Sequence, residues 1–155
     1  MMILILLILS LYLDGIICNN IYSNSFFMPL LTVITVYAIY PIYKKQEKKY
    51  FIIIMFLGII YDLIYTNLFL FTAIEFLVIG IISKYIYKNY SHNIYKEIIY
   101  IIIVILCYEL LTASILVIYK IVPVTISKVL NKIIHSLILN IIYGESLYFF
   151  IKKQA

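Results

Sequence analysis

Apolar stretches long enough to cross a membrane follow one another along almost the whole chain. Six of them are separated by short loops marked with lysine and tyrosine. A span needs roughly 20 apolar residues, so six spans use nearly all of the 155 residues. The chain is 66% hydrophobic and has a mean hydropathy of +1.11. A water-soluble domain of this size could not hide so much apolar surface, so the bilayer is the expected solvent.

The predicted architecture is all-α, with a single integral membrane domain over residues 1–155 and about six transmembrane helices. The loops are too short to fold alone. The expected helices cover residues 1–18, 26–43, 50–65, 68–87, 97–119 and 133–151. Pro41 lies in the last turn of the second helix, where it predicts a bend or a stop. The segment 121–130 is expected to lie along the membrane surface as a short amphipathic stretch.

The basic residues predict the orientation. All 12 of them are lysines, so bidentate arginine clamps for phosphate are unavailable. With a cytoplasmic N-terminus, three lysines fall outside and nine inside. The outer ones are Lys120, Lys128 and Lys132, and the inner ones are Lys44, Lys45, Lys48, Lys49, Lys84, Lys88, Lys96, Lys152 and Lys153. The positive-inside rule then predicts a multi-pass protein of the bacterial cytoplasmic membrane with both termini cytoplasmic, and it explains the basic charge without nucleic acid.

Tyrosines repeat this pattern at the two inner loops. Tyr40, Tyr43 and Tyr50 flank the first loop, and Tyr85, Tyr87, Tyr90 and Tyr95 flank the second. Amphipathic rings are typical of the headgroup level, and the chain has no tryptophan to take that place. We therefore expect these tyrosines to form an aromatic belt.

Two aspartates, Asp14 and Asp62, fall near the outer ends of the first and third predicted helices. Each precedes a polar turn, and the segments 24–45 and 67–88 align as a faint internal repeat. Ionisable groups cost on the order of 3 kcal/mol in hydrocarbon, so both are candidates for a role. They could cap the following turn, or they could line an outer vestibule or a rim that contacts a partner.

Three glutamates, Glu75, Glu109 and Glu145, lie deeper in apolar sequence. No lysine is expected at matching depth, so desolvation favours neutral carboxyl groups that donate hydrogen bonds. Helix association through polar groups such as Asn140 is one role for them. Proton or cation coupling, or a groove for a partner's helix, are the alternatives.

Catalytic and metal signatures are not found in the sequence. His92 and His135 have no ligand spacing, and Cys18 and Cys107 form no metal or disulfide pattern. The glycines are isolated, and no serine has a histidine base nearby. The chain is therefore expected to be no enzyme, with no catalytic residues, no metal and no cofactor.

The stretch from Gly58 to Thr72, with its Gly-x-x-x-Asp pattern at Gly58 and Asp62, resembles the signature hairpin of the MreD family of rod-shape-determining membrane proteins. The length, the six-helix layout, the lysine-rich first inner loop and the basic C-terminal end are also similar across essentially the full chain. Many members carry small residues, often glycine, four and eight positions after the aspartate. Here those places hold Thr66 and Leu70.

The resemblance implies a non-enzymatic scaffold of the cell-elongation machinery that maintains cell shape. Its implied partners are an MreC-like bitopic protein, an MreB-like filament and the cell-wall (peptidoglycan) synthases, together with membrane lipid and a second copy of the chain as a homo-oligomer. Gly58, Asp62, Thr66 and Asn67 would form the structural or partner-contact motif. The inner lysine loops would face the filament, anionic lipid, or both.

The main alternative is the substrate-binding subunit of an energy-coupling-factor vitamin transporter. That family has a similar size and six helices, and its fold is expected to be similar. It usually shows an Ala-x-x-x-Ala patch on the first helix, whereas residues 1–18 here contain no alanine.

Overall fold

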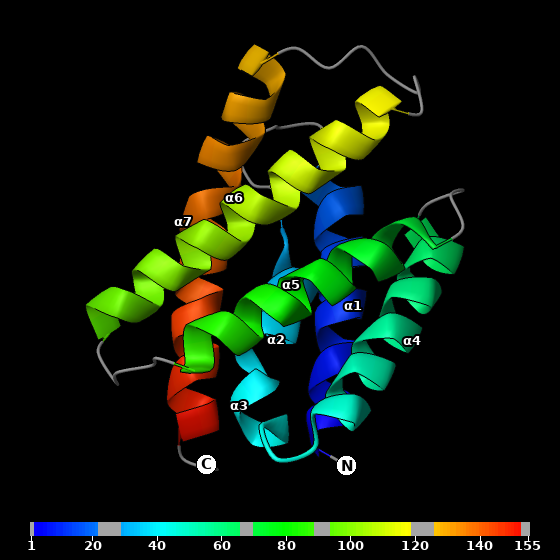
Figure 1. The fold of residues 1–155 in the computed structure, drawn as a ribbon. Helices are drawn as coiled ribbons and strands as arrows, with labels where there is room; N and C mark the ends of the chain where they lie inside the picture. Colours follow the sequence, from blue (N-terminus) through cyan, green and yellow to red (C-terminus); the bar gives the residue numbers. More distant parts are fainter. Residues whose placement is uncertain (1, 22–28, 66–69, 89–93, 119–125, 153–155) are drawn as a thin grey trace.

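The computed structural model describes residues 2–21, 29–65, 70–88, 94–118 and 126–152, and these residues are all-α, without strands. The helices are α1 (Met2–Ile21), α2 (Leu31–Ala38), α3 (Tyr40–Tyr43), α4 (Glu47–Tyr65), α5 (Phe71–Lys88), α6 (Ile94–Ile118) and α7 (Ile126–Lys152). Because α2 and α3 adjoin at Ile39, they make one bent unit, so the described segments form six helical units (Figure 1). The all-α prediction is confirmed.

The short helix α2 is the centre of the molecule. All eight of its residues are buried, and it packs against α1, α5, α6 and α7. The first residues of α1, the last residues of α7 and the turn between α3 and α4 lie at the same end (Figure 1). We call this the lysine end, because it carries the lysine-rich loop.

The start of α2 differs from the prediction. The helix was expected from residue 26, but it begins at Leu31, after Pro29 and a non-helical Leu30 with φ −128° and ψ 39°. Residues 26–28 lie outside the described part. Pro29 has no backbone N–H to donate to a preceding helical turn, which disfavours a helix running through this point.

The prediction of a bend or stop at Pro41 is confirmed. The helix breaks at Ile39, and Pro41 occupies the first turn of α3. The break interrupts the ladder of helical hydrogen bonds, and the Tyr50 hydroxyl of α4 donates to the Val36 carbonyl (2.9 Å). A side chain from another helix thus satisfies a carbonyl at the end of α2.

The start of α7 also differs from the prediction. Residues 126–130 belong to one continuous helix from Ile126 to Lys152, whereas a surface segment was expected there and the helix was expected from 133. Residues 121–125 lie outside the described part. Contacts with the antiparallel α6 extend α7 outward, so tertiary packing overrides the local amphipathic pattern.

Several of the expected belt tyrosines are internal. Tyr40, Tyr50 and Tyr87 are buried. The ring of Tyr87 stacks on Tyr37, with centroids 5.3 Å apart, and on Tyr40, whose ring meets Tyr50 edge-on. Only the exposed Tyr85 and Tyr95 match the expected placement among the residues that the structure describes, while Tyr43 is half-buried and Tyr90 lies outside it. The buried rings point inward because the helix ends that carry them pack near α2. The spacing of tyrosines along the sequence does not indicate this packing.

Two helices are long and apolar enough to cross a membrane, namely α6 over Ile94–Ile118 and α7 over Val129–Ile151. Within the described residues, the stretches Ile3–Ile17 and Leu31–Tyr43 are apolar but shorter.

Gly58 lets α4 and α5 approach each other closely. A Cβ added at Gly58 would meet the Ala73 Cα and would lie 2.7 Å from the Ala73 backbone nitrogen. A Cβ added at Gly80 would instead meet the flexible tip of Ile54, 2.6 Å from its Cδ1. Backbone cannot move aside as a side-chain methyl group can.

Gly58→Ala is therefore expected to destabilise the protein by about 1–3 kcal/mol through overpacking. Gly80→Ala is the matched control and should cost less, because the Ile54 tip can rotate away. Thermal unfolding of both variants in detergent would measure the difference. An equal loss of stability in the two would contradict the close backbone contact.

Candidate functional site

The N-terminus of α2 is buried, and a carboxylate from another helix receives its backbone N–H groups. The Leu31 N–H donates to Asp14 Oδ1 and the Thr32 N–H to Asp14 Oδ2, both at 2.9 Å. The Thr32 hydroxyl donates to the same Oδ2 (2.6 Å). The first N–H groups of a helix have no intrahelical partner. Asp14 of α1 therefore acts as a helix cap supplied from outside the helix.

Asn140 of α7 completes this cap. Its side-chain Oδ1 accepts the Leu30 N–H at 2.8 Å, and its Nδ2 donates to the Ser136 carbonyl (2.6 Å). Three consecutive N–H groups are thus satisfied by α1 and α7 together. Asp14 and Asn140, identified separately in the sequence, form one structural unit around the start of α2.

At the start of α5, a backbone N–H group is likewise accepted by a carboxylate of another helix, here α4. Both oxygens of Asp62 lie 3.0 Å from the Thr72 backbone nitrogen, which donates to them. Gly58, one helical turn before Asp62, admits the Ala73 backbone. The glycine brings α5 close, and the aspartate then receives the Thr72 N–H. Thr66 and Asn67, the other two residues of the predicted motif, lie outside the described part.

Leu70 has a left-handed backbone conformation, with a φ of 66°. It stands eight positions after Asp62, where the resemblance led us to expect a small residue, often glycine. Its carbonyl accepts the Ile74 N–H (3.2 Å), which begins the ladder of α5. The turn therefore requires a conformation that glycine adopts freely and leucine adopts at a cost.

Glu75 is fully buried between α5 and α6. The Thr112 hydroxyl donates to its Oε1 (2.7 Å). Its Oε2 is buried without a hydrogen-bond partner among the described residues. The contact with Thr112 joins the two helices through a polar pair, which is the kind of helix association weighed for these glutamates.

Glu109 has a lysine beside it, so the prediction that no lysine lies at matching depth was wrong. Lys132 Nζ of α7 is 3.7 Å from Glu109 Oε2 of α6, and the two side chains are 44% and 4% exposed. The expectation placed Lys132 in an external loop. Because α7 begins earlier, Lys132 lies in its second turn and faces α6.

Glu145 and Glu97 lie at the other end of α6 and α7. Glu145 is half-buried, and its Oε1 has no hydrogen-bond partner within the described residues. Glu97 is 1% exposed and accepts a hydrogen bond from the Tyr87 hydroxyl (3.5 Å). Glu97 is not among the site residues predicted from the sequence, because the helix was expected to begin at residue 97. A carboxylate in a first helical turn, favoured by the helix dipole, is the signal that could have found it.

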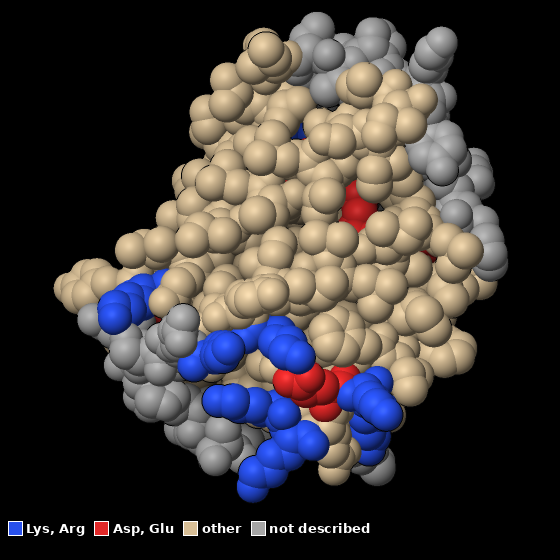
Figure 2. Space-filling model, in the orientation of Figure 1, with Lys and Arg blue, Asp and Glu red and all other residues tan. Residues whose placement is uncertain are grey.

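Charged side chains gather at the lysine end (Figure 2). The exposed lysines there include Lys44, Lys45, Lys48, Lys49, Lys84 and Lys88. Glu47 lies among them, and Lys84 Nζ donates to its Oε2 (2.6 Å). This hydrogen bond holds the pKa of the Glu47 carboxyl below its usual value. The rest of this face of the molecule is largely uncharged.

No family model, curated protein or solved structure matches the chain. Among the described residues, no group of three or more His, Cys, Asp and Glu side chains could hold a metal ion. Asp14, Asn140 and Asp62 instead accept N–H groups at helix starts, and Glu75 accepts the Thr112 hydroxyl. What the arrangement can do is hold helices in fixed positions.

Asp14→Ala is expected to destabilise the protein by about 3 kcal/mol, because it leaves buried N–H groups of α2 without an acceptor. Asp14→Asn keeps one acceptor oxygen and should lose about half as much. Ser10→Ala is the matched control, since Ser10 is as buried in α1 as Asp14 but, within the described part of the chain, bonds only the Leu7 carbonyl of its own helix. Chemical or thermal unfolding in detergent would rank the three. Similar losses for Asp14→Ala and Ser10→Ala would contradict the cap.

Leu70→Gly is expected to leave stability unchanged or raise it by up to about 1 kcal/mol, because the left-handed conformation costs an L-residue about 1–2 kcal/mol and glycine's greater freedom when unfolded offsets part of the relief. Leu70→Ala removes a similar amount of side chain but keeps the Cβ, so it should bring no relief. Unfolding midpoints of the pair would test this. A lower midpoint for glycine than for alanine would contradict strain at residue 70.

Proposed function

We propose that this protein is a polytopic membrane scaffold of the MreD type, which holds partner proteins of the cell-elongation machinery in the bilayer and performs no chemistry itself. The observation that carries the proposal is the close packing of α4 against α5 at Gly58 and Asp62. These two are the residues of the resemblance, and they act together on the start of α5.

The membrane setting is supported by the surface. Large apolar side chains are exposed on the outer helices, as at Leu63 (72%), Ile118 (74%) and Ile142 (68%). Exposure of this kind is unfavourable in water and costs nothing in lipid. Lysines cluster at the end of the molecule where α1 begins and α7 ends, which supports a cytoplasmic position for that end (Figures 1 and 2).

A scaffold is favoured over a carrier by how the buried charges are used. In transporters, the start of a broken helix in the membrane points at an anionic substrate. Here the start of α2 is a buried helix N-terminus, but Asp14 of the same chain already receives its N–H groups. A carboxylate substrate would have to displace this internal one. The vitamin-transporter alternative is therefore less well supported.

The partners proposed are a bitopic MreC-like protein, an MreB-like filament and the cell-wall synthases. An apolar exterior suits contact with membrane helices through close packing. The lysine end suits an acidic protein surface or anionic lipid on the cytoplasmic side. A second copy of the chain is a further candidate for the apolar exterior.

The test is co-purification of the tagged full chain from its native membrane in mild detergent, with mass spectrometry of the proteins that elute with it. An MreC-like protein or cell-wall synthases are expected with the parent. Asp62→Ala should reduce their recovery about tenfold, the effect of losing roughly 1.4 kcal/mol of binding. Ser10→Ala, a buried polar residue of α1 outside the hairpin, is the matched control and should leave recovery unchanged.

Amounts of each variant in the membrane must be equalised before recovery is compared, so that reduced folding is separated from reduced binding. Recovery of ATPases with a coupling subunit would overturn the scaffold proposal in favour of the transporter. Equal recovery of partners with Asp62→Ala and with the parent would mean that the α4–α5 hairpin does not take part in partner binding.

A further inference from the structure

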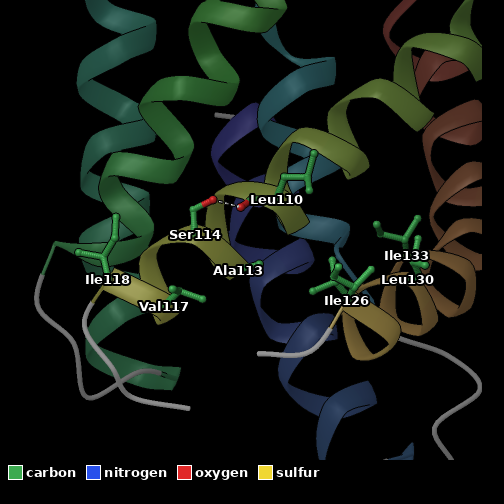
Figure 3. A pocket seen from close by; sticks show the side chains of 9 residues that line it. Leu110, Ala113, Ser114, Val117, Ile118, Ile126, Leu130 and Ile133 are labelled. Atoms are coloured by element: carbon green, nitrogen blue, oxygen red, sulfur yellow. Dashed lines mark hydrogen bonds between the residues drawn. The ribbon is translucent and has the colours of Figure 1, made fainter. Parts of the chain in front are cut away.

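The two ends of the α6–α7 pair differ in polarity. At the outer end, the described side chains that line the hollow between the helices are apolar apart from Ser114 (Figure 3). Nearer the lysine end, the same two helices carry the carboxyl groups of Glu97 and Glu145. The apolar hollow gives no sign of what fills it, whereas the region of the two glutamates contains oxygen atoms without hydrogen-bond partners among the described residues.

The packing of Gly144 fixes the level at which the two glutamates meet. A Cβ added at Gly144 would lie 2.5 Å from Ile101 Cδ1 and 3.2 Å from Ile34 Cγ2, so α7, α6 and α2 meet in one layer here. Glu145 follows Gly144 directly, and Glu97 lies about one helical turn before Ile101. The two negative charges repel each other across this contact.

Two tyrosine hydroxyls reach the same region from two further helices. The Tyr87 hydroxyl of α5 donates to Glu97 Oε1 (3.5 Å). Tyr37 of α2 stacks its ring on that of Tyr87, and the Tyr37 hydroxyl lies within electrostatic reach of Glu97. Oxygen atoms from α2, α5, α6 and α7 therefore come together in one place.

Two of these oxygen atoms have no hydrogen-bond partner among the described residues. One is the hydroxyl of Tyr37, a side chain with no exposed surface, and the other is Oε1 of Glu145. Glu145 also belongs to neither of the ion pairs found within the described part of the chain. A buried polar atom without a partner costs free energy, and the repulsion of two carboxylates is strong in a low dielectric.

A hard divalent cation would remove both costs. Carboxylate and water oxygens are the ligands that suit Mg²⁺. This ion is commonly held by one or two carboxylates and keeps several of its waters, which can hydrogen-bond to hydroxyl groups. A proton shared by the two carboxyl groups would end the repulsion but would leave the Tyr37 hydroxyl without a partner. Because Glu145 is only half-buried, an ion can reach the site from the surface.

We propose that Glu97 and Glu145 bind one hydrated Mg²⁺ ion between α6 and α7, with the hydroxyls of Tyr37 and Tyr87 hydrogen-bonded to its waters. The ion joins four helices, so its role is structural. Two carboxylates on different helices have no ligand spacing in the sequence, which is why the sequence predicted no metal. The site is distinct from the α4–α5 hairpin and does not depend on the proposed scaffold function.

The test is a titration of the full chain with Mn²⁺, which takes the same oxygen ligands as Mg²⁺. The chain is held in nanodiscs of phosphatidylcholine, a lipid without net charge, so that headgroups attract few cations. Electron paramagnetic resonance measures the free Mn²⁺, whose sharp spectrum is lost on binding. The parent is expected to bind one Mn²⁺ per chain, and Mg²⁺ is expected to displace it.

Three variants separate the ligands from their surroundings. Tyr37→Phe keeps the stacked ring and both carboxylates and should weaken Mn²⁺ binding about tenfold, as removal of a group that supports the ligands of a metal commonly does. Glu145→Gln removes a ligand and should weaken binding more than Tyr37→Phe. Glu47→Gln is the matched control, because Glu47 is a carboxylate at the lysine end that bonds Lys84, and it should leave the affinity unchanged.

Absence of Mn²⁺ binding by the parent would overturn the proposal, and so would equal affinity in Glu145→Gln and the parent. Unchanged affinity in Tyr37→Phe would exclude the Tyr37 hydroxyl from the site and overturn the four-helix arrangement.

A second measurement on the parent alone decides the matter if Glu145→Gln does not fold. Mg²⁺ is expected to raise the temperature of thermal unfolding, whereas sodium chloride of equal ionic strength should not. An equal response to both salts would reflect screening of charge and would overturn the proposal.

Discussion

The N-terminus of a helix cannot be buried unless something accepts its first N–H groups, and α2 begins in the middle of the molecule. Three N–H groups, from Leu30 to Thr32, are accepted by Asp14 and Asn140. At the other end of the same helix, the Tyr50 hydroxyl donates a hydrogen bond to the Val36 carbonyl. The central helix is therefore completed by α1, α4 and α7, and its unmet hydrogen bonds constrain where these helices lie.

The hairpin of α4 and α5 solves the same problem within a single pair of helices. Asp62 receives the Thr72 N–H while Gly58 allows the backbones to come close. The two aspartates explain why acidic residues recur before helix starts, which the sequence showed only as a faint repeat. Their burial is a requirement of the architecture, so charge within the apolar interior does not here demand a transported ligand. This use of internal partners is what favours a scaffold.

Much of the fold could be predicted from the sequence because long apolar runs and the breaking effect of Pro41 are local signals. The all-α class and the helical units were predicted from them. The late start of α2 was also encoded locally, at Pro29, but an apolar sequence on both sides concealed it. The inward Tyr50 and Tyr87 and the pairing of Lys132 with Glu109 could not be predicted, because they depend on which helices become neighbours. The same holds for Asn140, whose partner lies 110 positions away.

That long separation bears on how the chain is made. The donor at Leu30 is synthesised 110 residues before its acceptor, Asn140 of α7. A buried N–H without an acceptor is costly, so the start of α2 is incomplete until α7 has packed against it. A chain cut short before α7 would keep a polar defect at its core. Packing of α7 therefore completes the start of α2, and the unpaired N–H group would distinguish an unfinished chain from a finished one.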